Sequence, residues 1–209
     1  MDKKIKVKNI LCYSRYDFNS IMKNNGWIDE IGPNCAAISI CDSDKPDDHW
    51  FKTDFYKFGL GFFATNFRVF NLDIDDCSPY WFKNHESECY DKALELYKEG
   101  KVEQSNNYFN RLVEFGENNE YCKMLYPMNY RDAEYLVTWI DYVIKKYDTI
   151  YVHCTAGASR SQGVVRYIID TYCNDYIIKL NPDNPNDTYN AHVTMMLKRA
   201  FREIYSKNS

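Results

Sequence analysis

Apolar and polar positions alternate along the chain with two different periods. Runs of apolar β-formers predict four strands, at residues 5–14, 34–41, 67–74 and 149–153. Apolar positions that recur every three or four residues predict four helices in the main fold, at residues 17–31, 130–148, 163–173 and 189–205. Strands that alternate with helices favour an α/β fold with a central, mostly parallel sheet flanked by helices.

The first predicted helix lies between two predicted strands, so the chain is expected to open with a β-α-β unit. Within the range of this helix, Asn25 and Gly26 predict a turn or a helix stop. The most regular helical period follows Tyr130, where the apolar positions fall on one face of a helix. These positions are Ala133, Leu136, Val137, Ile140, Val143 and Ile144.

Composition and charge mainly exclude alternatives: a second full domain, a nucleic-acid or membrane partner, a membrane span and a secreted protein. A chain of 209 residues that is 45% hydrophobic can bury one sizeable core, so a single domain over residues 1–209 is expected. The net charge of −4 gives no overall reason to bind nucleic acid or an anionic membrane. No apolar run approaches the roughly eighteen residues of a membrane span, and no secretory pattern is present, so we expect a cytoplasmic protein.

The spacing of the eight cysteines and four histidines predicts neither disulfides nor a zinc site. The cysteines are scattered without CxxC pairs, so reduced thiols are expected rather than disulfides. The histidines show no i, i+4 pairing and no regular spacing from cysteines, so no zinc site is predicted. We expect a protein without a metal or another cofactor.

One stretch, HCTAGASRSQG at residues 153–163, lies at the junction of a predicted strand and a predicted helix. A loop at a helix N-terminus directs backbone N–H groups toward an anion, and small side chains let the backbone approach that anion closely. Arg160 adds a planar cation that can hold two phosphate oxygens. Cys154 in such a loop is expected to be a thiolate near neutral pH, because cysteines in sites of this kind titrate at about 3.5 to 7.5.

Each of these residues alone has an ordinary structural explanation, since a buried cysteine is a small hydrophobe and an arginine at a helix start is a solvated charge. The joint pattern H-C-x-x-G-x-x-R-S is far more specific. It resembles the signature of the cysteine-dependent protein phosphatases, and within them the dual-specificity phosphatases. The resemblance is most specific over residues 130–200 and weaker over residues 5–76.

The resemblance implies a protein-tyrosine-phosphatase-like fold and a phosphocysteine intermediate on Cys154. It implies that Ser161 hydrogen-bonds the cysteine sulfur, and that His153 orients the loop and lowers the pKa of the cysteine. Phosphate would be bound by Arg160 and by the amides of Thr155, Ala156, Gly157, Ala158 and Ser159. We therefore expect an enzyme that hydrolyses phosphotyrosine in proteins, with phosphoserine and phosphothreonine left open as further substrates.

The family also uses an aspartic acid from a separate loop, which protonates the leaving group and later activates water. This chain departs from the usual spacing, because no aspartate lies between Asp91 and Asp132. Asp76 is the first choice, since it ends the segment LDIDD (residues 72–76) and lies just beyond the end of the predicted strand, and Asp75 and Asp132 are the alternatives. Asp132, at the start of a predicted helix, is by default a helix cap, and the aspartates of residues 73–76 are by default a solvated loop.

The choice of Asp76 makes residues 78–126 an insertion between the acid and the nucleophile. This segment predicts two amphipathic helices around Gly100, faintly similar to a single tetratricopeptide unit. No second copy is present, so the segment is expected to be a helical hairpin packed on the domain.

Two other functions stay open. One is a phosphate-binding pseudophosphatase adaptor, against which the intact Cys154 and Arg160 argue. The other is a phosphoinositide or RNA 5′-phosphatase of the same superfamily, whose members often carry basic residues within the loop. The four variable loop positions, 155, 156, 158 and 159, are uncharged here, which favours a phosphorylated protein as the partner.

Overall fold

The computed structural model describes residues 5–51, 68–76, 128–172 and 189–206, together with single positions from Lys92 to Asn107. The chain divides into two compact units. One comprises Met1–Asp76 and Met128–Ser209, and the other comprises Cys77–Pro127. The sheet, the helices that flank it and the residues of the candidate site belong to the first unit.

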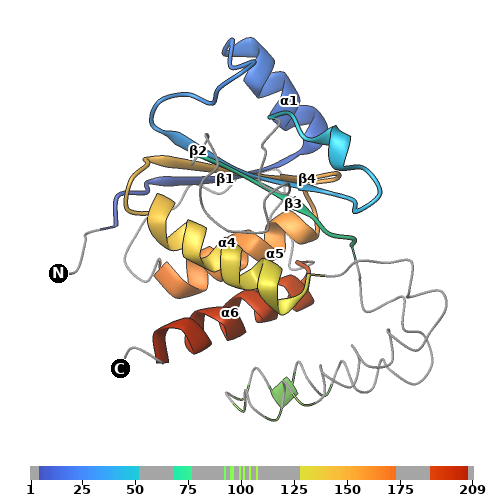
Figure 1. Ribbon diagram of the computed structural model, residues 1–209, viewed down its shortest axis with the longest axis vertical. Helices are drawn as coiled ribbons and strands as arrows, with labels where there is room; N and C mark the ends of the chain where they lie inside the picture. Colours follow the sequence, from blue (N-terminus) through green and yellow to red (C-terminus); the bar gives the residue numbers. More distant parts are fainter. Residues whose placement is uncertain are drawn as a thin grey trace. The chain divides into compact units, whose positions relative to one another are not determined.

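Parallel strands form the central sheet of the first unit (Figure 1). They are β1 (Asn9–Ser14), β2 (Cys35–Cys41), β3 (Val69–Asp73) and β4 (Thr149–Cys154). Their order across the sheet is β1-β4-β2-β3, so β4 lies between the two strands that open the chain. Cys154 therefore ends a central strand, in register with Ser14 of β1.

Helices cover both faces of this sheet (Figure 1). One face carries α1 (Arg15–Asn24) and the short 3-10 helix η1 (Pro46–Asp48), and the other carries α4 (Tyr130–Val143), α5 (Arg160–Tyr172) and α6 (Ala191–Ser206). Successive residues of a strand point to opposite faces. In β4, His153 therefore packs against α1, whereas Val152 and Cys154 join the core beneath α4, α5 and α6.

The predicted α/β fold with a parallel sheet is confirmed, and so is the opening β-α-β unit. The range 17–31 predicted for the first helix is too long. The helix begins directly after Ser14, whose side chain caps it by accepting a hydrogen bond from the Asp17 amide at 3.1 Å. It ends before Asn25, the C-cap, and Gly26 follows with a φ of +70°, so the predicted helix stop is where the helix ends.

The predicted insertion, residues 78–126, lies outside the described residues except for a few single positions. Among these, Lys92, Glu95 and Leu96 are helical. None of the helices that the structure describes is both long and apolar enough to cross a bilayer.

Candidate active site

The signature loop, residues 155–159, joins the end of β4 to the start of α5. Its central residue, Gly157, has a φ of +73°, which residues with a side chain rarely adopt. A Cβ at this position would lie 2.5 Å from the backbone nitrogen of Ser14 and 2.6 Å from the carbonyl carbon of Tyr13. Glycine is therefore required for the loop to pass against the end of β1.

Cys154 is the last residue of β4 and is 2% exposed. Its Sγ lies 3.2 Å from the Oγ of Ser161, a buried residue in the first turn of α5. A second thiol, Cys12 of the neighbouring strand β1, contacts the carbonyl oxygen of Gly157 at 3.6 Å. Burial raises the pKa of Cys12 to about 12, so this thiol stays protonated at neutral pH and does not compete as a nucleophile.

Arg160 begins α5 and is 3% exposed. Its Nη1 donates to the carbonyl oxygen of Ile74 at 2.6 Å and pairs with Oδ1 of Asp42 at 2.8 Å, while Nη2 donates to Oγ1 of Thr155 at 3.2 Å. The Nε of Arg160 has no hydrogen-bond partner among the described residues. Leaving a buried donor unpaired costs free energy, so the Nε edge of this guanidinium is suited to bind an anion.

The backbone of the signature loop offers further donors. Within the described part of the chain, the N–H groups of Thr155, Ala156, Ala158 and Ser159 donate to no acceptor. The helix α5 starts directly after them, so its dipole adds partial positive charge at the same place. The loop therefore combines free amides, a helix N-terminus and an arginine edge next to a buried thiol, which together suit a phosphate group.

Asp76 is held against this loop although it follows a different strand, β3. Its Oδ1 accepts a hydrogen bond from the Oγ of Ser159 at 2.7 Å and another from the Nδ2 of Asn190 at 2.9 Å. Ser159 directly precedes Arg160 in the signature loop. The structure thus places the first-choice acid at the loop that carries the thiol and the arginine.

The two alternative acids have other contacts. Both oxygens of Asp75 accept hydrogen bonds from Ser43, one from its amide at 3.0 Å and one from its hydroxyl at 2.8 Å. Asp132 belongs to a capping box, in which its carboxylate accepts from the Asn129 amide at 3.2 Å and its own amide donates to the Asn129 side chain at 3.0 Å. The cap of α4 is therefore Asn129, and Asp132 supports it. Burial raises the pKa of Asp132.

Two residues of the site were missed by the sequence reasoning: Asp42, which pairs with Arg160, and Asn190, which bonds Asp76. A signal for Asp42 was present, because it directly follows the apolar strand β2, and the carboxyl ends of parallel strands meet at one edge of the sheet. For Asn190, the sequence could predict only a helix cap, because it directly precedes α6, and nothing in it indicated a contact with Asp76.

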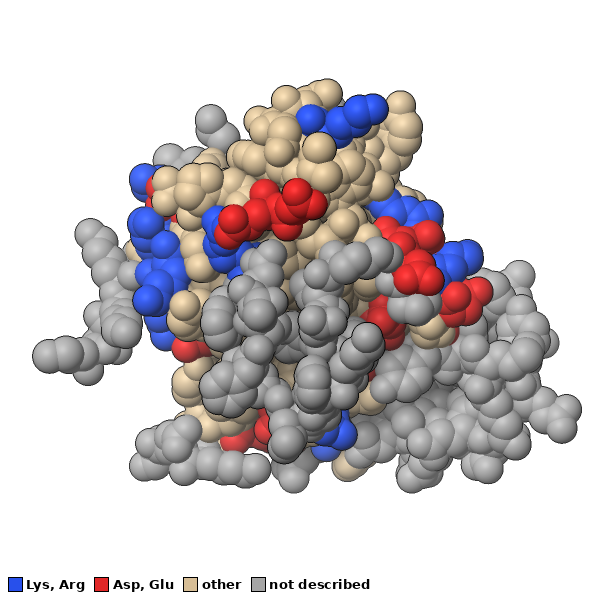
Figure 2. All heavy atoms as spheres, turned by 45° about the horizontal axis from the view of Figure 1, so that its top comes forward, with Lys and Arg blue, Asp and Glu red and all other residues tan. Residues whose placement is uncertain are grey.

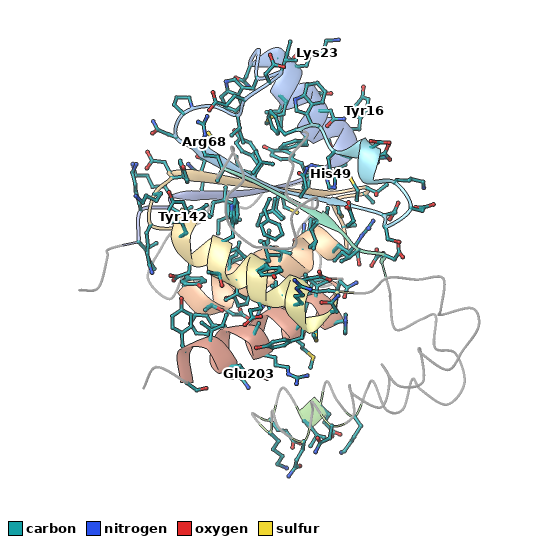
Figure 3. All side chains as sticks on the ribbon, viewed as in Figure 1. Tyr16, Lys23, His49, Arg68, Tyr142 and Glu203 are labelled. Carbon is teal, nitrogen blue, oxygen red and sulfur yellow. The ribbon has the colours of Figure 1, made fainter. Side chains whose placement is uncertain are left out.

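A separate polar cluster lies on the α1 face of the sheet, where Figure 3 shows His49. The Nδ1 of His49 is 2.6 Å from the Oγ of Ser39, and its Nε2 is 2.6 Å from Oδ1 of Asp73. Ser39 is only 1% exposed and points to the face opposite that of Cys154. Ser39 of β2 and Asp73 of β3 are therefore linked through His49, which directly follows η1. These contacts connect the three segments on this face of the sheet.

His153 lies on the same face, completely buried, with its ring stacked on Phe18 at a centroid distance of 4.1 Å. Neither ring nitrogen forms a regular hydrogen bond to the described residues. Burial lowers the pKa of His153 to about 3, and the electrostatic effects of His49 and Arg15 act in the same direction. His153 is therefore neutral in the folded protein at neutral pH.

This burial predicts that the protein loses stability in acid. Below its ordinary pKa of about 6.5, the unfolded chain binds a proton at His153 that the folded chain excludes until the pH nears 3. The free energy of unfolding should therefore fall by about 1.4 kcal/mol per pH unit from this residue as the pH drops through that window. Urea unfolding at pH 7, 6 and 5 measures the slope.

His153→Asn is the matched variant, because it removes the titrating group from the same buried position. It is expected to be less stable at pH 7 and to show a shallower loss toward pH 5. An unchanged slope would contradict the assignment. His192, whose pKa burial also lowers, contributes in the same direction in both proteins and cancels from the comparison.

No family model, no curated protein and no solved structure matches this chain. Among the residues that the structure describes, no group of three or more histidine, cysteine or acidic side chains is arranged to hold a metal ion.

Proposed function

We propose that this protein is a cysteine-dependent phosphatase of the dual-specificity or protein-tyrosine type, with a protein-tyrosine-phosphatase-like fold. The observation that carries the proposal is a set of donors beside Cys154 that have no partner among the described residues, namely the Nε of Arg160 and the amides of Thr155, Ala156, Ala158 and Ser159. Asp76 at the same loop supplies a proton donor. A nucleophile, a phosphate site and an acid are the three parts that phosphoryl transfer to sulfur requires.

In the first step, the Sγ of Cys154 attacks phosphorus in line with the ester oxygen. The S–P bond forms, the P–O bond to the leaving group breaks, and Asp76 gives its proton to the departing oxygen. Arg160 and the loop amides bind the three remaining oxygens, over which the negative charge of the transition state is spread.

In the second step, water attacks the phosphorus of the phosphocysteine. Asp76, now a carboxylate, takes a proton from this water, and the S–P bond breaks to release phosphate and the thiolate. The Ser161 hydroxyl, 3.2 Å from the sulfur, stabilises that thiolate by donating a hydrogen bond to it.

The charge around the signature loop supports a protein substrate. In the segments 42–48 and 74–76, which follow β2 and β3, Lys45 is the single basic residue, and Arg15, which follows β1, pairs with Asp48. Figure 2 shows acidic side chains gathered on the right-hand side of the described surface, with basic ones beside them. The acidic residues of the two segments are Asp42, Asp44, Asp47, Asp48, Asp75 and Asp76. A phosphoinositide or an RNA 5′ end would bring further negative charge against them, whereas a peptide need not.

The position of Asp76 supports an enzyme over a phosphate-binding adaptor. An adaptor needs only the arginine and the loop amides, because it binds phosphate without breaking a bond. A carboxyl group fixed at the loop by Ser159 and Asn190 serves proton transfer and adds nothing to the binding of an anion.

The role of Asp76 as the acid can be tested by comparing two substrates whose leaving groups differ in their need for a proton. Wild-type protein is expected to hydrolyse a phosphotyrosyl peptide and aryl phosphates in the presence of a metal chelator. Asp76→Asn should slow the hydrolysis of phenyl phosphate, whose leaving group needs the proton, by about 10²-fold or more. Dinitrophenyl phosphate, whose leaving group hardly needs it, should be affected much less. Steady-state kcat on the two esters is the measurement.

Asp75→Asn is the matched control, since this neighbouring carboxylate accepts hydrogen bonds from Ser43, and it should change neither rate by more than about twofold. Equal losses on both esters in Asp76→Asn would point to a damaged fold. Full activity of Asp76→Asn on phenyl phosphate would move the acid to Asp75 or Asp132. Turnover of a phosphoinositide but not of the peptide would overturn the substrate class.

A further inference from the structure

Asn190 connects three parts of the site that are far apart in the sequence. It is 4% exposed and directly precedes α6. Its side-chain Oδ1 accepts from the Val193 amide at 3.1 Å, which makes it the N-cap of that helix. Its Nδ2 donates to Oδ1 of Asp76 at 2.9 Å, and its backbone N–H donates to the carbonyl oxygen of Ser159 at 3.1 Å.

We propose that Asn190 is the positioning residue of the candidate acid, fixing the Asp76 carboxyl group relative to the signature loop. This inference rests on the proposed function, in which Asp76 donates the proton. Asn190 does not touch the reacting atoms in this scheme; it acts through Asp76.

The arrangement of donors around Asp76 carries the inference. Both hydrogen bonds, from Asn190 and from Ser159, go to Oδ1. No hydrogen bond to Oδ2 is made by the described residues. One oxygen is thus anchored while the other stays available to carry the proton, and two donors on one oxygen restrict rotation of the carboxyl group. Such restraint matters because a misplacement of about 1 Å can cost roughly 10²-fold in rate.

The packing of α6 against α5 keeps Asn190 in this place. A Cβ on Gly163, in the first turns of α5, would lie 2.6 Å from the carbonyl oxygen of Asn190, so the absence of a side chain there allows the close approach. Thr194, one turn into α6, donates to the carbonyl oxygen of Gly163 at 2.8 Å. The start of α6 is therefore fixed against α5, the helix that begins with Arg160. Through its hydrogen bond to Asp76, Asn190 fixes that carboxyl group relative to the same helix.

Asn190→Ser separates the two roles of this side chain. Serine is as good an N-cap as asparagine, so α6 should be retained, but its hydroxyl is too short to reach Asp76. We expect hydrolysis of phenyl phosphate to slow by about 10-fold or more and hydrolysis of dinitrophenyl phosphate to change by less than about twofold. The melting temperature should stay close to that of the wild type. Asn190→Asp, which also keeps the cap acceptor and lacks the donor, should show the same selective loss.

A double-mutant cycle with Asp76→Asn distinguishes positioning from a structural role. If Asn190 acts through Asp76, Asn190→Ser should slow phenyl phosphate hydrolysis by less than about twofold in the Asp76→Asn background. Thr194→Val is the control for the packing of α6, and any loss it causes should be equal on the two esters.

The outcomes separate this inference from the proposed function. Equal losses on both esters in Asn190→Ser, full activity of that variant, or losses that add to those of Asp76→Asn would overturn the positioning role alone. An Asp76→Asn variant with full activity on phenyl phosphate would overturn the acid assignment, and the role of Asn190 with it.

Discussion

Cys154→Ser is expected to abolish the hydrolysis of aryl phosphates, by roughly 10⁴-fold or more, while the protein stays folded. A serine hydroxyl remains protonated at neutral pH and cannot replace a thiolate as the nucleophile. The substitution changes one atom of a buried side chain, and the hydroxyl can keep the contact that the sulfur makes with Ser161 at 3.2 Å. The measurement is kcat on dinitrophenyl phosphate, because the leaving group of that ester hardly needs a proton, so its rate reports on the nucleophile and not on the general acid.

Cys35→Ser is the matched control for this variant. Cys35 is the first residue of β2, so it lies at the opposite end of the sheet from Cys154. The same exchange of sulfur for oxygen there should leave kcat within about twofold of the wild type. Substantial turnover by folded Cys154→Ser protein would exclude a phosphocysteine intermediate and overturn the proposed function.

Arg160→Lys is expected to lower kcat/KM by about 10²-fold or more on both esters, although the charge is conserved. A lysine ammonium can still pair with Asp42, but it has no counterpart of the Nε edge of Arg160, which has no partner among the described residues. The loss should therefore be independent of the leaving group, in contrast to the effect expected for Asp76→Asn. Steady-state kinetics with both esters give this distinction.

Arg166→Lys on the same helix is the control for the exchange of arginine for lysine. Arg166 is half-exposed and pairs with Asp170 one turn further along α5. A surface pair of this kind contributes little, so turnover should be unchanged. Near-normal activity of Arg160→Lys would mean that the arginine does not hold the phosphate.

The sheet and the signature loop could be predicted from the sequence because their determinants are local. The apolar runs of β2 and β4 are buried on both faces, and such strands read as continuous apolar segments. The loop could be found from the spacing of Cys154, Gly157 and Arg160, and the structure adds the reason for the glycine, which is its approach to the backbone of β1.

The connections around Asp76 could not be predicted, because they depend on how distant segments pack. Asn190 and Asp76 are 114 residues apart, and no local pattern relates a helix cap to a carboxylate after a strand. The end of α1 was mispredicted for a different reason, which is local. Its apolar period continues beyond Gly26, but the left-handed backbone of that residue ends the helix, so local conformation prevailed over periodicity.

The position of β4 between β1 and β2 governs the order in which the chain can acquire its structure. Asn9 of β1 pairs with Thr149, so the closing contact of the sheet spans 140 residues. Contacts of such high sequence separation form slowly, and a nascent chain on the ribosome holds β1 and β2 with unpaired edges until residues 149–154 emerge. The proposed nucleophile is the last residue of the strand that fills this gap. Synthesis therefore completes the sheet and supplies Cys154 at the same moment.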